Sequence, residues 1–376
     1  MQSILQEIMR IRGNGELHID YHNANRYRVV LKEQNHTRTA YYFSSPIYNI
    51  HTKEAVDMKF HSRGGMYHLK GSNADITIND QIHLKNQIAS CDISLRTPVT
   101  STAKEVLYCN RDTIYPTTNG VAYRAYIKNT NEYSFIVRTE NHFSEIRAND
   151  KTIAFMQEQF RPLFSISCIG TCNEYGNVIA PAKIRCQKED EKTYIVTLIP
   201  RSPIGTYALF EVNLYEPKLF QDTTVESGRP KVNNAFGNTA FLGTTVACGE
   251  QWLYTRLDFS KMTELLDKRI HSAILYMPQY NSTQRTLAAY GVNSRFCSFG
   301  SNWDNKVKET YEMTKSYQID GYQVLNITNH MTEPYEKRIR YNNGFILRTK
   351  DKTDGFVAVA TADNYYTPQI LEINYE

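Results

Sequence analysis

The sequence predicts an all-β protein in which two or three β-sandwich or jelly-roll domains follow one another after a short N-terminal helix. Three observations support this expectation. The chain holds 27 Tyr and 16 Phe, and these residues, like Val, Ile and Thr, fit the half-buried surface of a pleated strand. Apolar and polar residues alternate wherever a period can be identified. With 376 residues, the chain also exceeds the roughly 250 to 300 residues at which a single core stops growing.

The first predicted element is the helix, over residues 1–12. Its apolar residues recur at helical spacing: Ile4, Leu5, Ile8 and Met9. Charged residues interrupt them, so the segment has an apolar face but lacks the unbroken apolar stretch of a secretory signal. The apolar face would pack against the body of the protein or against a partner.

Strands are expected throughout the rest of the chain. Four apolar residues share parity and would line one face of a strand, or of two successive short ones: Ile76, Ile78, Ile82 and Leu84. The same alternation occurs in residues 132–138 and 193–199. Strands of this kind need a core on one side only, as in a sandwich.

Turn residues separate these strands at short intervals, for example Gly64-Gly65, Asn119-Gly120 and Asn343-Gly344. Candidate domain boundaries lie at residues 97–105 and 215–221. The predicted division is a helix at 1–12, a β-sandwich at 13–104, a second β-sandwich at 105–218, or one unit formed by both, and a third β-sandwich at 219–376.

The C-terminal part carries an ordered series of motifs. It begins with the strand-like residues 222–228 and an Asn/Gly-rich loop, continues with Arg256-Leu257-Asp258-Phe259, and ends with residues 356–360 and 368–375. In this order the motifs resemble the DNRLRE domain of bacterial proteins, over about residues 222–376. The central motif is similar to the arginine-leucine-x-phenylalanine-aspartate signature of that family, but its aspartate is displaced. The resemblance implies a sandwich module of a bacterial surface protein; residues 1–220 resemble no family.

Residues near that motif suggest both a core and a calcium site. Leu253, Leu257 and Phe259 share parity and would face the core, whereas Arg256 and Asp258 would face the other side and could pair with neighbouring strands. Calcium takes six to eight oxygen ligands. Asp222 and Asp258, together with carbonyl groups of the Asn/Gly-rich loop, are therefore candidate calcium ligands; the alternative is that they are ordinary turn carboxylates.

An aromatic-rich N-terminal region suggests a carbohydrate site. Its candidate residues are Tyr41, Tyr42, Tyr48 and Tyr67. Flat aromatic rings can stack on the apolar faces of sugars, so exposed rings would form a binding platform. The alternative is that tyrosine, with its amphipathic body, is simply a good strand residue.

Motifs for metal binding and catalysis are weak. His18, Asp20 and His22 would project from one face of a strand, where alternating polar residues on a solvent-exposed face are the simpler interpretation. Cys168 and Cys172 form C-x3-C without a second pair, and an odd total of 7 cysteines favours mostly free thiols. The common nucleophile, nucleotide-binding and metalloprotease motifs are missing. We therefore expect no enzyme and no cofactor other than calcium.

Composition narrows the function classes further. A net charge of +4 supplies no strong field for nucleic acid, and no stretch approaches the ~20 apolar residues needed to span a bilayer. The first hypothesis is a structural or adhesive protein of a bacterial cell surface, spore layer or phage-like or filamentous assembly. It would be made without a recognisable signal, would be cytoplasmic before assembly, and would bind further copies of itself or assembly partners. The alternatives are a carbohydrate-binding protein and a hydrolase of polysaccharides with an accessory sandwich.

Overall fold

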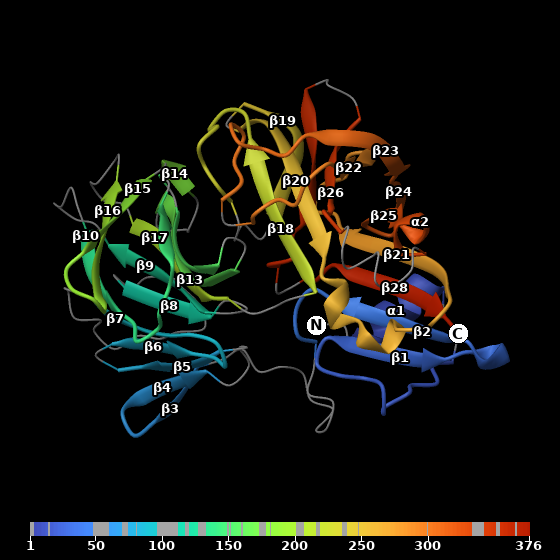
Figure 1. Ribbon diagram of the computed structural model, residues 1–376, viewed down its shortest axis with the longest axis horizontal. Coiled ribbons are helices and arrows are strands. Elements are labelled where there is room, and N and C mark those ends of the chain that lie inside the picture. Colours follow the sequence, from blue (N-terminus) through green and yellow to red (C-terminus); the bar gives the residue numbers. More distant parts are fainter. Residues whose placement is uncertain are drawn as a thin grey trace. The chain divides into compact units, whose positions relative to one another are not determined.

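A computed structural model shows the fold (Figure 1). It describes residues 4–13, 16–47, 60–69, 74–79, 81–95, 112–116, 120–126, 133–148, 150, 152–158, 161–172, 178–180, 182–200, 207–215, 219–234, 239–246, 248–298, 300–332, 342–350, 354–364 and 367–376. These residues form antiparallel sheets and a few short helices. The all-β class predicted from the sequence is confirmed, as is the short N-terminal helix.

The chain divides into two compact units. The first, called here the terminal unit, comprises Met1–Val56, Lys218–Pro230 and Asn234–Glu376, and the second, the inserted unit, comprises Asp57–Pro217 and Lys231–Asn233. This division differs from the predicted boundaries, because residues before position 57 join the C-terminal sandwich instead of starting a domain at 13–104. Residues 97–105, a predicted boundary, lie outside the described part of the chain.

Two sheets build the terminal unit. Sheet I has the order β1 (Arg28–Lys32), β2 (Arg38–Phe43), β28 (Ile370–Tyr375), β21 (Ile270–Pro278), β25 (Tyr322–Asn326) and β24 (Tyr317–Ile319). Sheet II has the order β23 (Glu309–Lys315), β22 (Leu287–Val292), β26 (Phe345–Thr349), β20 (Gly249–Leu257), β19 (Thr239–Thr245) and β27 (Gly355–Ala360), and β18 (Phe220–Glu226) also pairs with β20.

Pairing between β2 and β28 explains why the N-terminal segment belongs to the terminal unit. Their register runs from Arg38 opposite Tyr375 to Phe43 opposite Ile370, so strands far apart in the sequence share one sheet. Local sequence patterns link only neighbouring segments, so this long-range pair could not be predicted from them.

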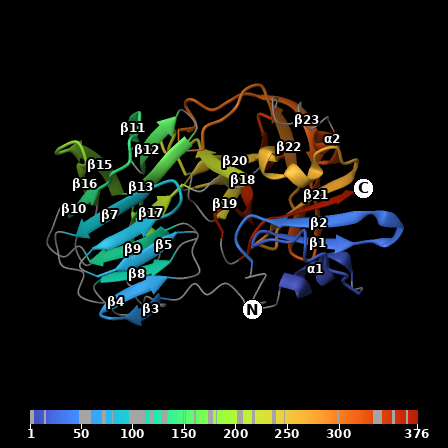
Figure 2. The ribbon, with the colours of Figure 1, turned by 60° about the horizontal axis from the view of Figure 1, so that its bottom comes forward.

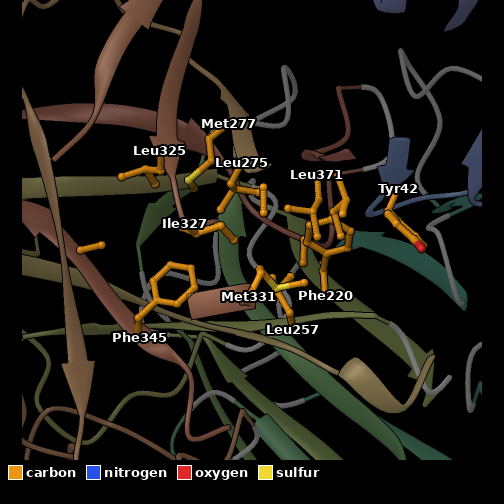
Figure 3. Packing of buried hydrophobic residues seen from close by; sticks show 14 of the residues in the cluster. Tyr42, Phe220, Leu257, Leu275, Met277, Leu325, Ile327, Met331, Phe345 and Leu371 are labelled. Atoms are coloured by element: carbon orange, nitrogen blue, oxygen red, sulfur yellow. The ribbon is translucent and has the colours of Figure 1, made fainter. Parts of the chain in front are cut away.

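A common core fills the space between sheets I and II. Leu275, Leu325 and Leu371 from sheet I and Phe345 from sheet II belong to one buried cluster, which Figure 3 shows from close by. Leu253, Leu257 and Phe259 are members of the same cluster, as their shared parity predicted. The terminal unit is thus a β-sandwich.

The terminal unit also contains short helices, of which α1 (Ile4–Arg12) covers part of sheet I. The helix packs on sheet I, where Ile8 is fully buried among Val29, Tyr41 and Val324, and Figure 2 shows it beside β1 and β2. Its apolar face is therefore used within the unit. The other helices are α2 (Thr328–Met331) and the 3-10 turns η1 (Gln34–His36), η2 (Phe259–Lys261) and η3 (Thr263–Leu265). No helix in the described ranges has the length and apolar character needed to cross a bilayer.

The inserted unit is a second sandwich of two sheets. Sheet III has the order β15 (Ala182–Lys188), β16 (Thr193–Pro200), β10 (Tyr133–Arg138), β7 (Ser90–Leu95), β6 (Ile82–Lys85), β5 (Asp75–Ile78), β4 (Met66–Leu69) and β3 (Phe60–Arg63). Sheet IV has the order β11 (Glu145–Ala148), β12 (Thr152–Glu158), β13 (Arg161–Cys172), β17 (Tyr207–Leu214), β9 (Gly120–Tyr126) and β8 (Asp112–Pro116), and β14 (Val178–Ala180) also pairs with β13.

The alternation of apolar and polar residues along the strands explains which side chains form the core of the inserted unit. Ile76 and Ile78 on β5, with Ile82 and Leu84 on β6, are buried in one cluster that also takes residues from sheet IV. The prediction that these four residues line one face of two short strands is confirmed. The intervening residues lie on the opposite face of sheet III.

Candidate functional site

The outer face of sheet II, which points away from the sandwich core, carries a cluster of aromatic and basic side chains. Since Leu253 of β20 faces the core, its neighbour Trp252 faces outward. The segment after β22 brings Trp303 against it, with the two ring centroids 5.0 Å apart. Both tryptophans of the chain therefore lie together in the terminal unit. We call Trp252, Tyr290, Trp303, Lys306 and Arg348 the tryptophan cluster.

Two cations lie over the rings of the tryptophan cluster. The Nζ atom of Lys306 is 3.9 Å from the centroid of Trp303, and the guanidinium of Arg348 is 4.4 Å from that of Tyr290 and 5.6 Å from that of Trp252. Such contacts are worth about 0.5 to 2 kcal/mol each, depending on desolvation. The rings are half-buried, so this cluster covers the sheet and leaves part of each ring accessible.

An acidic partner holds Arg348 in place, whereas Lys306 donates a hydrogen bond of 3.0 Å to the backbone carbonyl of Trp303. Arg348 donates two hydrogen bonds to Glu309, of 3.0 and 3.1 Å. Burial lowers the pKa of Arg348, but the bonds to Glu309 outweigh it and the net shift is upward. Burial also lowers the pKa of Lys306, against the weaker opposing charges of Glu250 and Asp304. Nearby carboxylates partly offset both cations, so the tryptophan cluster offers the faces of its rings more than net charge to a ligand.

A second aromatic group lies at the β27 edge of the same face. Phe241 of β19 is opposite Ala358 of β27, and the backbone N–H of Tyr280 donates to the carbonyl of Ala358. Phe241 therefore flanks Ala358 on one side and Tyr280 flanks it on the other. Phe356 packs edge-on against Phe241 at 5.5 Å. We call Phe241, Tyr280 and Phe356 the aromatic surface.

Polar groups position Tyr280 and the backbone that carries Phe356. The hydroxyl of Tyr280 accepts a hydrogen bond from Asn364 (2.7 Å) and contacts the hydroxyl of Thr367. The side chain of Asn281 bridges the backbone of Phe356 and Ala358 with two bonds of 2.9 Å. Phe241 and Tyr280 nevertheless remain 40% and 46% exposed. Exposed, fixed rings beside amide groups form a surface suited to ligands with both apolar and polar faces.

A third exposed feature is the strand edge on the opposite side of the terminal unit. β23 ends sheet II and β24 ends sheet I, and each pairs with a single strand among those described. Tyr311 is 67% exposed, and Tyr317 and Ile319 are also exposed. We call β23 and β24, with these three side chains, the exposed edge. Unpaired edges with apolar side chains are common sites of association.

The tyrosines predicted to bind carbohydrate do not form an exposed platform. Tyr41 is fully buried between sheet I and α1, and Tyr42 faces the sandwich core. Tyr67 is half-buried and packs against the core of the inserted unit, and Tyr48 lies outside the described residues. This corrects the prediction for Tyr41 and Tyr42, because adjacent tyrosines on a strand of a covered sheet have no solvent-exposed face.

Charged side chains lie beside both buried tyrosines. The hydroxyl of Tyr42 bonds to Glu264, which also forms an ion pair with Arg28. Tyr41 is opposite Glu372 of β28, and burial raises the pKa of that carboxyl group. In addition, Arg12 of α1 donates two hydrogen bonds to Glu33, which follows β1. These contacts attach the helix to the sheet and have a structural role.

The structure does not bring the predicted calcium ligands together. Asp222 is buried and accepts a hydrogen bond of 2.6 Å from the backbone of Ala362. Asp258 accepts bonds from the hydroxyl and backbone of Ser260, where it caps η2. Asp222 lies opposite Thr255 and the backbone of Asp258 opposite Leu219, so they are offset along the ladder. Calcium binding by this pair stays a prediction that the geometry does not favour.

The other weak motifs are also separated. Residues 21–23 form a turn, so His18, Asp20 and His22 do not share a strand face as predicted. Asp20 is buried and bonds to Asn23. Five described cysteines form no disulfide bond: Cys91, Cys168, Cys186, Cys248 and Cys297. In the described part of the chain, no group of three or more His, Cys, Asp or Glu residues is arranged to hold a metal ion.

Arg256 shows the predicted cross-strand pairing. It donates to the side chain of Gln221 on β18 (2.8 Å) and to the carbonyl of Asn342 (3.1 Å). Arg256 therefore links neighbouring segments of the fold and has a structural role.

Comparisons with known proteins do not identify a family: no protein-family model matches the chain, and no curated protein matches it either.

Proposed function

We propose that this chain is a non-enzymatic structural or adhesive protein of a bacterial surface, spore layer or phage-like or filamentous assembly. The observation that carries the proposal is the exposed edge, which gathers three exposed apolar side chains within nine residues on two singly paired strands. The resemblance of residues 222–376 to the DNRLRE domain supports the bacterial and surface-associated part of the proposal. The partner would be a further copy of the chain or another component of the assembly.

Side chains, more than backbone groups, would supply the contact. The pairing of β22 with β23 contains two register shifts, and such bulges twist an edge away from regular strand addition. Continuous edge-to-edge growth is therefore disfavoured. Tyr311, Tyr317 and Ile319 can still be buried by a partner, and aromatic residues are enriched among the side chains that dominate interfaces.

The first prediction concerns this edge. In sedimentation velocity over a range of concentrations, the wild-type chain is expected to associate, and the double variant Tyr311→Lys/Tyr317→Lys to associate about tenfold to thirtyfold more weakly, because two charges replace apolar anchors. Tyr21→Lys is the matched control, since the exposure of Tyr21 (53%) lies between those of Tyr317 (49%) and Tyr311 (67%) and it lies outside the exposed edge. A wild-type chain that is monomeric at every concentration would remove the proposal.

The aromatic surface favours a second candidate function, carbohydrate binding. Unlike Tyr41 and Tyr42, Phe241 and Tyr280 expose their rings, and Asn281 and Asn364 lie beside them. Aromatic rings with neighbouring amides suit sugars, which present C–H faces and hydroxyl groups. The hypothesis of an exposed aromatic platform is thus kept, with different residues.

The second prediction tests this alternative. If a glycan array identifies a ligand, Phe241→Ala and Tyr280→Ala are each expected to weaken its binding by about threefold to tenfold, the range for losing one ring contact. Tyr311→Ala, an exposed tyrosine on the other edge, should leave binding unchanged. Equal weakening by all three variants would show that the aromatic surface is not the site.

A further inference from the structure

A short hairpin in the inserted unit places two histidines opposite each other. β3 and β4 pair antiparallel, with His61 opposite His68. Gly64 and Gly65 make the two-residue connection, and both have positive φ angles of 60° and 79°. Two positive φ angles characterise the tight hairpin turn whose twist matches that of its strands. The glycine pair therefore determines the register that places His61 opposite His68.

Both histidines lie on the outer face of sheet III. Their chain neighbours Phe60 and Leu69 pack against the core of the inserted unit, so His61 and His68 point to the opposite face. His61 is exposed and His68 is half-buried. β3 is also the last strand of the sheet in the described part of the chain. The pair is thus accessible from solvent.

The spacing of such a pair suits one metal ion. Residues directly opposite in an antiparallel ladder have Cβ atoms about 4.5 to 5.5 Å apart, and imidazole nitrogens bind transition metals at about 2.0 to 2.1 Å. Two imidazoles that lean toward each other can therefore share an ion. Neutral imidazole is a preferred ligand of copper, zinc and nickel.

We propose that His61 and His68 together bind one divalent transition-metal ion, with Cu2+ held more tightly than Zn2+ in accordance with the usual order of stability. The remaining coordination positions are open to water or to a ligand from another molecule. The site is independent of the association and carbohydrate functions proposed above, which involve the terminal unit.

The same face supplies a matched control. The cross-strand row continues from His68 through Thr77 to His83. There the imidazole Nδ1 of His83 contacts the carboxylate of Asp92. Thr77 separates His83 from the pair, so His83 has the same residue type, sheet and face but no opposing imidazole. Substituting it removes a histidine without touching the site.

The experiment is a calorimetric titration of the full, tag-free chain with CuCl2 and with ZnCl2. One strong site is expected for each metal, with Cu2+ tighter. His61→Asn and His68→Asn should each weaken it by about tenfold or more, while His83→Asn leaves it unchanged. Electron paramagnetic resonance of the Cu2+ form should show nitrogen ligands that are lost in both site variants.

Two outcomes would overturn the proposal. Equal weakening by His83→Asn would mean that the ion distributes over surface imidazoles. Unchanged binding in His61→Asn or His68→Asn would mean that the pair is not the site. Circular dichroism of each variant verifies that the sheet is intact, which is expected because all three side chains project away from the core.

Discussion

Replacing Arg229 with methionine is expected to lower the free energy of unfolding of the terminal unit by about 3 kcal/mol, the low end of the range for removing one partner of a buried ion pair. The carboxylate of Glu226 is fully buried, and Arg229 lies 2.5 Å from it with a side chain 35% exposed. Gln251 donates a further hydrogen bond of 3.1 Å to Glu226. Without Arg229, the neutral donor Gln251 leaves the buried charge uncompensated.

Tryptophan fluorescence measures this effect selectively, since Trp252 and Trp303 are the chain's two tryptophans and both belong to the terminal unit. The denaturant concentration at the midpoint of the fluorescence transition should be lower in Arg229→Met than in the wild-type chain. Adding Glu226→Gln to that variant should recover most of the loss, because a neutral amide costs far less to bury than a charge. If the double variant were no more stable than Arg229→Met, the ion pair would not be the cause.

Replacing Phe155 with alanine is expected to destabilise the inserted unit by about 3 to 5 kcal/mol. The fully buried ring of Phe155 stacks on Phe164 at 4.2 Å and meets Phe143 and Tyr194 edge-on at 5.3 and 5.2 Å. Alanine removes the ring that these three contact and leaves a cavity among rigid neighbours, which relax only in part.

Far-UV circular dichroism follows the strands of both units and should show an earlier transition in Phe155→Ala, while the fluorescence transition of the terminal unit stays in place. Phe155→Leu is the matched control, and it should cost less than about 1.5 kcal/mol because most of the volume is kept. A fluorescence midpoint that moved together with the dichroism signal would show that the two units unfold as one.

Local features of the fold were predictable from the sequence because they depend on local alternation. Ile76, Ile78, Ile82 and Leu84 share parity and are all buried, since a pleated strand must turn every second side chain the same way. The two-glycine connection after Arg63 was likewise recognisable as a turn. Such signals use only a few consecutive residues.

Long-range pairing explains what the sequence did not reveal. The pairing of β2 with β28 moves residues before position 57 into the terminal unit, and the cover formed by α1 buries Tyr41. Tyr41 and Tyr42 therefore lack the exposure that a stacking platform needs. The exposed Phe241 and Tyr280 come from segments far apart in the sequence, so only the folded sheet brings them together.

The pairing of β2 with β28 also bears on the order in which the protein can fold as it is made. Synthesis proceeds from the N-terminus, so β1 and β2 are released from the ribosome long before their partner strand at Ile370–Tyr375 exists. All of the inserted sandwich between positions 57 and 217 emerges in that interval and can fold first. Until the later strands arrive, the side chains of Val30 and Tyr42 lack the sandwich core that buries them in the finished unit, so the newly made hairpin exposes this face for most of the synthesis.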